Sequence, residues 1–330
     1  MGDSPGPAAA VDGERVAVGI DAVPVLGEAL ARAAVPLVAR LTLSGSSGPV
    51  DGAVVTVEAR AGAVVLGPGA ELRCDLRPGR TTVLTDIGLL ADADVLGSAG
   101  LPPAAEIGVR VTAAGREIGA GAARVRVLGP GEWIAAPAPL ALELLAAHVR
   151  PDDPAVAALV GSATDLLRTQ TGDPAREPSR SDAHRIDQTA AALVEALRRR
   201  AIRPAPSPAG WADVPQRVRT PTEVLDGRVA SNLDAVVTLA AAFEHAGLRP
   251  LLWVADGHAF LGCWRADRSA PTTATTDVAG LVHLVHGGAV QLIETTMLVE
   301  PARVATFGDL HRTPLAAWLG GDLHLSLIHI

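Results

Sequence analysis

Residues 229–264 read VASNLDAVVTLAAAFEHAGLRPLLWVADGHAFLGCW, and this stretch decides the fold. Its first part, about residues 231–246, is apolar on nearly every side, which predicts a helix buried at the centre of a domain. Gly247 ends that helix. Two apolar runs follow, RPLLWVAD and HAFLGCWRAD, and they meet at Gly257, so we expect two paired strands. A third strand is expected in AVQLIETTML, residues 289–298.

The order of a buried helix, a strand, a Gly-His strand and a strand with an acid resembles the transglutaminase-like papain fold. In that fold a Cys opens the central helix, a His lies on the next hairpin, and an acid follows on the neighbouring strand. The resemblance assigns the His to His258 in GHAF and the acid to Glu294 in LIETT. It places Asn232 at the Cys position. Asn232 has neither a nucleophile nor a titrating proton, so the expected thiol chemistry is missing.

A closer resemblance is to the N-terminal region of large bacterial superfamily-1 helicases, which carry a domain of unknown function ahead of the motor. It covers residues 15–322, and the blocks that carry it are PQRVRTPTEVLDGRVASNLD, AGLRPLLWVADGHAFLGCW and VQLIETTML. That family usually reads Thr-Cys-Leu-Asp where this chain reads Ser-Asn-Leu-Asp, residues 231–234. Some members end in a very-short-patch-repair-like nuclease and are linked to phage defence.

The resemblance implies an accessory, regulatory region of an ATP-dependent DNA helicase, with a pocket that has become a pseudo-enzyme. One alternative is an active hydrolase or acyltransferase in which Ser231 replaces the nucleophile and works with His258 and Glu294. A shift of one residue on a helix turns a side chain by about 100°, which disfavours this alternative. The other alternative is a stand-alone protein-binding module.

Residues 14–130 read as an all-β domain. Short alternating runs separated by turn residues are typical of a β-sandwich. One helix is expected within this region, at residues 24–34, and the fragment GAGAAR near residue 119 is interpreted as a hairpin turn. The expected strands are RVAVGI, PLVARLTL, AVVTVEA, ELRCDL, EIGVRVT and ARVRVL.

Residues 131–324 are interpreted as the transglutaminase-like α+β domain, which begins with helices. PLALELLAAHV, PAVAALVGSATDLLRTQTG and SDAHRIDQTAAALVEALRRR have helical spacing of apolar residues. A Pro-rich connection spans residues 203–220, in which Arg217 and Arg219 are candidates to order a loop over the pocket by pairing with an acid. The fold class expected for the whole chain is therefore α+β.

The amino-acid composition excludes several classes of function. The chain has 330 residues, 28 cationic side chains that are all Arg, and a net charge of −8. Without Lys it is neither a Schiff-base enzyme nor a phosphate-loop NTPase. Few aromatic residues and a negative charge argue against nucleic-acid binding by this region itself. We therefore expect no cofactor here. ATP and Mg²⁺ would belong to a downstream helicase core, the partner in cis, and DNA would be bound only through that core. A protein partner is also expected.

The remaining side chains that could take part in catalysis or metal binding have simpler interpretations. Cys263 lies five residues after His258, so the two point to opposite faces of one strand, and Cys263 is interpreted as a core thiol. Cys74 is expected to be inert. His283 and His286 have no accompanying carboxylate or Cys cluster, so no metal site is expected. Trp211, Trp253, Trp264 and Trp318 are expected in the core of the second domain.

The two ends of the sequence look different from the rest. Residues 1–13 are expected to be a disordered lead-in and lack the features of a signal peptide. No run of about 18 apolar residues suggests a membrane span, so we expect a cytoplasmic protein. The last six residues, LSLIHI, also translate the codons of a transposon-derived sequencing adapter. We interpret residues 325–330 as a non-native tail and expect the natural protein to continue.

Overall fold

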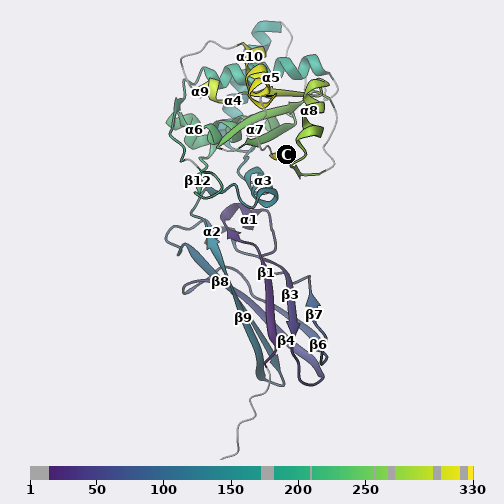
Figure 1. Cartoon of the computed structure of the whole chain (residues 1–330). Helices are drawn as coiled ribbons and strands as arrows, with labels where there is room; N and C mark the ends of the chain where they lie inside the picture. The colour runs from purple at the N-terminus through teal and green to yellow at the C-terminus, as the bar shows by residue number, and fades with distance from the viewer. Residues whose placement is uncertain are drawn as a thin grey trace, which may run out of the picture. The chain divides into compact units, whose positions relative to one another are not determined.

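The computed structural model describes residues 15–171, 182–208, 210–255, 257–266, 272–299, 306–319 and 326–329. The expected lead-in, residues 1–13, lies outside this range. Helix and strand contribute almost equally, 32% and 33%, so the α+β class is confirmed. The chain divides into two compact units, Met1–Pro130 and Gly131–Ile330 (Figure 1). No helix among the described residues is long and apolar enough to cross a membrane.

The first unit consists mainly of two sheets, which are antiparallel except for the short parallel pair of β2 with β9. One has the order β1-β3-β7, and the other has the order β2-β9-β8-β4-β5, with β6 also paired to β4. Alternate residues of the long strands are buried, and the others face solvent, which is the pattern that predicted these strands. The strands are β1 (Ala17–Ala22), β2 (Val25–Leu26), β3 (Val38–Ser44), β4 (Val50–Ala61), β5 (Val64–Val65), β6 (Ala70–Leu76), β7 (Thr82–Leu84), β8 (Ala104–Ala113) and β9 (Arg116–Val127).

Two expectations for this unit were wrong in detail. The helix expected at residues 24–34 is shorter: β2 comes first, and α1 spans only Glu28–Arg32. A further short helix, α2, spans Ala93–Leu96. The fragment GAGAAR is not a turn but lies inside β9. Its glycines are needed because β1 crosses close by: a Cβ on Gly119 would lie 2.5 Å from the carbonyl oxygen of Val16.

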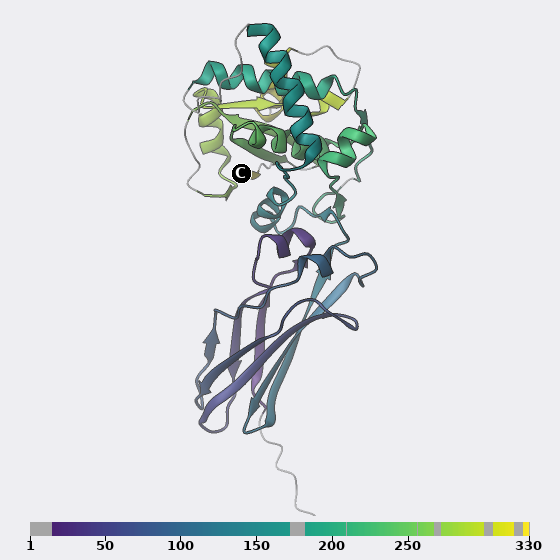
Figure 2. The ribbon, with the colours of Figure 1, turned by 180° about the vertical axis from the view of Figure 1, so that it is seen from behind.

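The second unit is built around a buried helix, α7 (Asn232–His245), which matches the helix expected at residues 231–246. One side of α7 contacts β14 and β15, and α4 and α5 pack against it as well. Figure 2, which views the chain from behind, shows the teal helices α4 and α5 in front of this unit's sheet. The other helices are α3 (Ala138–Ala146), α4 (Pro154–Thr171), α5 (Ala183–Arg198), α6 (Pro221–Gly227), α8 (Val278–His286), α9 (Thr296–Val299) and α10 (Phe307–Leu319).

The main sheet of the second unit has five strands in the order β16-β18-β14-β15-β17. The hairpin of β14 (Pro250–Ala255) and β15 (His258–Trp264) turns at Gly257, whose φ is +69°, a conformation that favours glycine. Short two-residue strands pair elsewhere in the unit. They are β10 (Glu132–Trp133) with β12 (Gln216–Arg217), and β11 (Arg203–Pro204) with β13 (Val229–Ala230).

Tryptophans fill the core of this unit, as expected. Trp211, Trp253 and Trp264 are each at most 3% exposed, and the Trp253 ring stacks on Phe260 with centroids 5.5 Å apart. The side chain of Trp318 lies outside the part that the structure describes.

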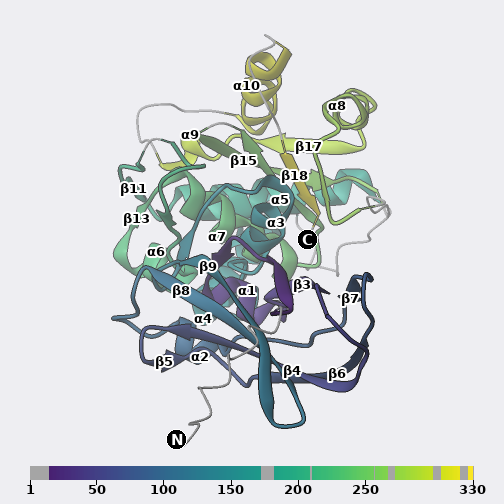
Figure 3. The same ribbon diagram turned by 60° about the horizontal axis from the view of Figure 1, so that its bottom comes forward.

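The third strand is shorter than expected from residues 289–298. β17 spans only Val290–Ile293, and the chain then bends at Thr295 and enters α9. Glu294 therefore follows the strand rather than lying within it. Helices α8 and α10 lie beside β17 (Figure 3).

Near the end of the sequence, Ser326–His329 form β18. This strand pairs antiparallel with β14 and with β16 (Ala274–Thr275). Residues 325 and 330 of the interpreted tail lie outside the described residues. The adapter origin of the tail stays a prediction.

Replacing Gly119 by Ala should destabilise the protein, because the new Cβ would lie 2.5 Å from the carbonyl oxygen of Val16. We expect a loss of about 1–3 kcal/mol in the free energy of unfolding, measured by denaturant titration. Gly108→Ala is the matched control, since its nearest neighbour would be the Glu58 carbonyl oxygen at 4.0 Å. Equal stability of the Gly119 variant and the control would contradict the close crossing of β1 and β9.

Candidate functional site

The candidate site begins at the N-terminus of α7, where Ser231 is the N-cap residue. The Ser231 hydroxyl accepts a hydrogen bond from the Asp234 amide at 3.2 Å, and the Asp234 carboxylate accepts one from the Ser231 amide at 2.8 Å. This reciprocal pair is a capping box. Because Ser231 is only 4% exposed and its hydroxyl is engaged in the cap, its side chain has a structural role.

Asn232, the next residue, connects α7 to two other elements. Its Oδ1 accepts a hydrogen bond from the Ala259 amide at 2.8 Å, and its Nδ2 donates to Oγ1 of Thr295 at 3.1 Å. Leu261 of β15 pairs with Ile293 of β17, and continuing that register by two residues would place Ala259 opposite Thr295. The sheet pairing stops before that point. The Asn232 amide therefore takes the place of the missing peptide group at the end of the β15–β17 ladder.

His258 and Glu294 form a direct pair beside Asn232. Nε2 of His258 lies 3.0 Å from Oε2 of Glu294, and the carboxylate accepts this hydrogen bond. The Glu294 side chain is 5% exposed, whereas the His258 side chain is 35% exposed. Among the described residues, none forms a hydrogen bond with Nδ1 of His258. The arrangement orients an imidazole whose second nitrogen is available, as in a general acid–base pair.

Glu294 is held in its ionised form. Burial by itself raises the pKa of this carboxyl, but the hydrogen bond and charge of His258, with two donations from Thr296, bring the pKa below its usual value. Thr296 donates to Oε1 from its amide at 3.1 Å and from its hydroxyl at 2.8 Å. Each oxygen of the carboxylate therefore has a donor, which fixes its orientation.

A loop is tied to the start of α7 by a buried ion pair. Asp234 is fully buried, and both the amide and Nη1 of Arg219 donate to its carboxylate at 2.7 Å. Arg217 pairs with Glu223 at 2.7 Å on the same connection. Both Arg217 and Arg219 thus pair with an acid, as expected, and their effect on the order of the loop stays a prediction.

Helix α10 secures the strand that leads to Glu294. The amide of Glu294 donates to the Leu310 carbonyl, and the amide of Leu292 donates to Nδ1 of His311, both at 3.0 Å. Burial and the nearby positive charge of Arg265 lower the pKa of His311, which keeps Nδ1 available as an acceptor. These contacts satisfy amides on the outer edge of β17.

The structure thus brings together Asn232, His258 and Glu294, and it keeps Ser231 in the helix cap. Sequence reasoning missed the supporting residues Thr295 and Thr296, although both lie within the quoted LIETT block. It also missed Leu310, for which the sequence carries no signal, because the contact uses a backbone carbonyl.

The cysteines lie apart from this pair. Cys263 is fully buried, and burial raises the pKa of its thiol to about 12. Cys74 belongs to β6 of the first unit, where burial raises the pKa of its thiol as well. Neither thiol is activated. His283 and His286 are exposed on α8. Among the described residues, no group of three His, Cys, Asp or Glu side chains could hold a metal ion.

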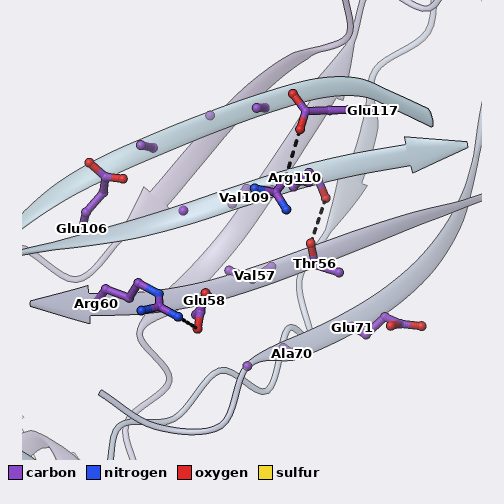
Figure 4. A pocket seen from close by; sticks show the side chains of 15 residues that line it. Thr56, Val57, Glu58, Arg60, Ala70, Glu71, Glu106, Val109, Arg110 and Glu117 are labelled. Atoms are coloured by element: carbon purple, nitrogen blue, oxygen red, sulfur yellow. Dashed lines mark hydrogen bonds and ion pairs between the residues drawn. The ribbon is translucent and has the colours of Figure 1, made fainter. Parts of the chain in front are cut away.

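A hollow lies on the open face of the larger sheet of the first unit. Small residues of β8 and β9, including Gly108 and Ala122, form its floor. Figure 4 shows Arg110 and Glu117 pointing toward each other across it, at 3.0 Å. Arg60 pairs in the same way with Glu58 on β4 at 2.9 Å. Glu71 and Glu106 also line the hollow, so its lining contains more acidic than basic side chains.

Comparison with the sequence models of known protein families gives no match, and comparison with curated proteins gives none either.

Glu294→Gln should weaken the protein near neutral pH, because the carboxylate accepts charge-assisted hydrogen bonds. We expect a loss of about 1.5–3 kcal/mol in the free energy of unfolding at pH 7. The pKa of Glu294 is lower in the folded than in the unfolded protein, so its contribution is complete above the ordinary value of 4.5. It is then lost as the pH falls through the lowered value.

The measurement is denaturant unfolding between pH 3 and pH 7. The difference between wild type and Glu294→Gln should shrink as the pH falls below 4.5. Glu71→Gln, an exposed carboxyl 3.8 Å from Arg73, is the control and should have little effect. A difference that is constant with pH would contradict an ionised Glu294.

Proposed function

We propose that this chain is an accessory region of a cytoplasmic, helicase-type DNA-processing protein and that its pocket is a pseudo-enzyme. The pocket keeps the His258–Glu294 pair and has lost the nucleophile. Its role is then to contact a protein or to regulate the motor rather than to catalyse a reaction. Within this proposal the first unit is a β-sandwich-like domain, and the second is a transglutaminase-like α+β domain.

The observation that carries the pseudo-enzyme proposal is the use of the Asn232 side chain. Both its oxygen and its nitrogen are engaged in hydrogen bonds, with Ala259 and Thr295. An amide in this position has no proton to lose and no free lone pair directed at a substrate. In this proposal, position 232 holds the supporting side chain of Asn232 in place of the reactive cysteine of the family that it resembles.

The second candidate function, a hydrolase or acyltransferase that uses Ser231, is less well supported. The Ser231 hydroxyl caps α7 and is buried, whereas Asn232 points to the strand that carries His258. A serine nucleophile needs a hydrogen bond to its base.

The helicase context is supported by the residue blocks at 215–234, 246–264 and 290–298. In the structure, the residues of these three blocks include Asp234, His258 and Glu294, which lie around one helix terminus and the neighbouring hairpin. The blocks therefore correspond to one place in the fold, as expected if they define a single site.

Asn232→Cys tests whether the pocket could still activate a thiol. A cysteine at a helix N-terminus beside a His should have a pKa well below the ordinary value of about 8.5. We expect alkylation of residue 232 by iodoacetamide at pH 6–7, followed by peptide mass spectrometry. Adding His258→Ala to this variant should shift the reactivity to higher pH.

Two outcomes would count against the proposal. A cysteine at position 232 that titrates at the ordinary pKa, and does not respond to His258→Ala, would show that the pocket is not arranged for thiol activation. Labelling of wild-type Ser231 by a fluorophosphonate, lost in His258→Ala, would establish the hydrolase instead.

The helicase context makes a separate prediction at the level of the gene. Long-read sequencing of the source locus should reveal a reading frame that replaces residues 325–330 and continues into a phosphate-binding loop with a Lys. A stop codon directly after Ile330 would contradict it and would favour the stand-alone binding module.

A further inference from the structure

Many arginines in this protein are paired with an acid. Among the described residues, arginines of both units lie within 4.0 Å of a carboxylate. They include Arg32, Arg40, Arg60, Arg73, Arg77, Arg110, Arg168, Arg217, Arg219, Arg265 and Arg312. This pairing leaves most of the surface without concentrated positive charge.

Five arginines that lie close together in the fold are less fully paired. Arg198 and Arg199, at the end of α5, share the single carboxylate of Glu195, each with a contact of 2.7 Å. Arg200, Arg203 and Arg228 have no ion pair with any described residue. We call these five arginines, residues 198, 199, 200, 203 and 228, the basic surface.

Local backbone pairing brings the members of the basic surface together. The amide of Arg203 donates to the carbonyl of Arg228 at 2.9 Å, where β11 runs parallel to β13. Only two residues lie between Arg200 and Arg203. Arg203 and Arg228 are exposed, and Arg200 is half-buried. Figure 3 shows β11 and β13 side by side, next to α6.

The charges at this place do not cancel. Of these five guanidinium groups, two pair with the single carboxylate of Glu195 and three have no ion pair with any described residue, in a protein whose net charge is −8. The basic surface also lies close to the candidate site. Arg228 precedes Asn232 by four residues, so their Cα atoms are at most about 14 Å apart.

We propose that the basic surface binds a short acidic segment of a partner protein. Guanidinium groups bind carboxylates with two parallel hydrogen bonds, and unpaired ones are free to do so. The surrounding charge favours a short ligand over a nucleic acid. A duplex would extend far beyond these five residues and meet the acidic remainder of the protein, whereas a peptide of a few residues would stay within one Debye length, about 8–10 Å.

The backbone at Arg228 provides a way to separate binding from folding. Arg228 ends α6 in the left-handed conformation, with φ of 49°, where glycine is normally preferred. Arg228→Gly therefore removes the side chain and relieves the backbone at the same time. It should leave the melting temperature unchanged or raise it, while it weakens binding.

The experiment measures binding of a fluorescein-labelled peptide of three glutamates to the full chain by fluorescence polarisation at 50 mM salt. We expect Arg203→Glu/Arg228→Glu to weaken binding about tenfold or more and 300 mM salt to weaken binding to wild type. The matched control is Arg80→Glu/Arg116→Glu, which makes the same change of charge at exposed arginines of the first unit. It should change the Kd less than about twofold.

Several results would overturn the proposal. These are no binding of the peptide to wild type, an equal loss in the control, or full affinity in Arg228→Gly. Equal or tighter binding of a 20-base-pair DNA duplex would assign the basic surface to nucleic acid instead. None of these results depends on Asn232 or His258, so the outcome is independent of the pseudo-enzyme proposal.

Discussion

The side-chain amide of Asn232 is the contact on which the candidate site depends. It joins the start of the buried helix to the hairpin through Ala259 and to the bend after β17 through Thr295. Both partners lie next to the His258–Glu294 pair in sequence. A buried hydrogen bond contributes about 1 kcal/mol, and leaving its partner unsatisfied costs more. The same two hydrogen bonds that hold the pocket together therefore engage both polar atoms of the Asn232 side chain.

The surroundings of the pocket reinforce this arrangement from three directions. Arg219 and Ser231 satisfy the buried Asp234, which fixes the helix start. Thr296 and His258 satisfy the Glu294 carboxylate. Leu310 accepts from the Glu294 amide, which fixes the backbone that presents the acid. Such a rigid setting is what a catalytic pair needs, and it serves equally well as a fixed surface for recognition.

Much of the second unit could be predicted from sequence, because its strongest signals are local. The nearly uniform apolar character of residues 231–246 identified α7, and Gly257 identified the turn of the hairpin. The length of β17 could not be predicted in this way. The expected strand extends past Ile293, but the chain leaves the sheet there because Asn232 and the Leu310 carbonyl take over the next hydrogen bonds. These are long-range contacts that no local pattern encodes.

The first unit also contains a feature that local sequence patterns do not predict. Glycines between alternating residues normally indicate a turn, yet Gly119 and Gly121 lie inside a continuous strand. The reason is the close approach of Val16 and Val18 from a strand about a hundred positions earlier in the sequence, which only the folded chain reveals.

Amide hydrogen exchange at Ala259, followed by NMR, tests the role of Asn232 most directly. In Asn232→Ala the Ala259 amide loses its acceptor, so its protection should fall about tenfold or more, while amides inside α7 such as that of Val237 keep theirs. Asn232→Asp retains an acceptor oxygen and should preserve the protection. Unchanged protection of Ala259 in Asn232→Ala would contradict the account.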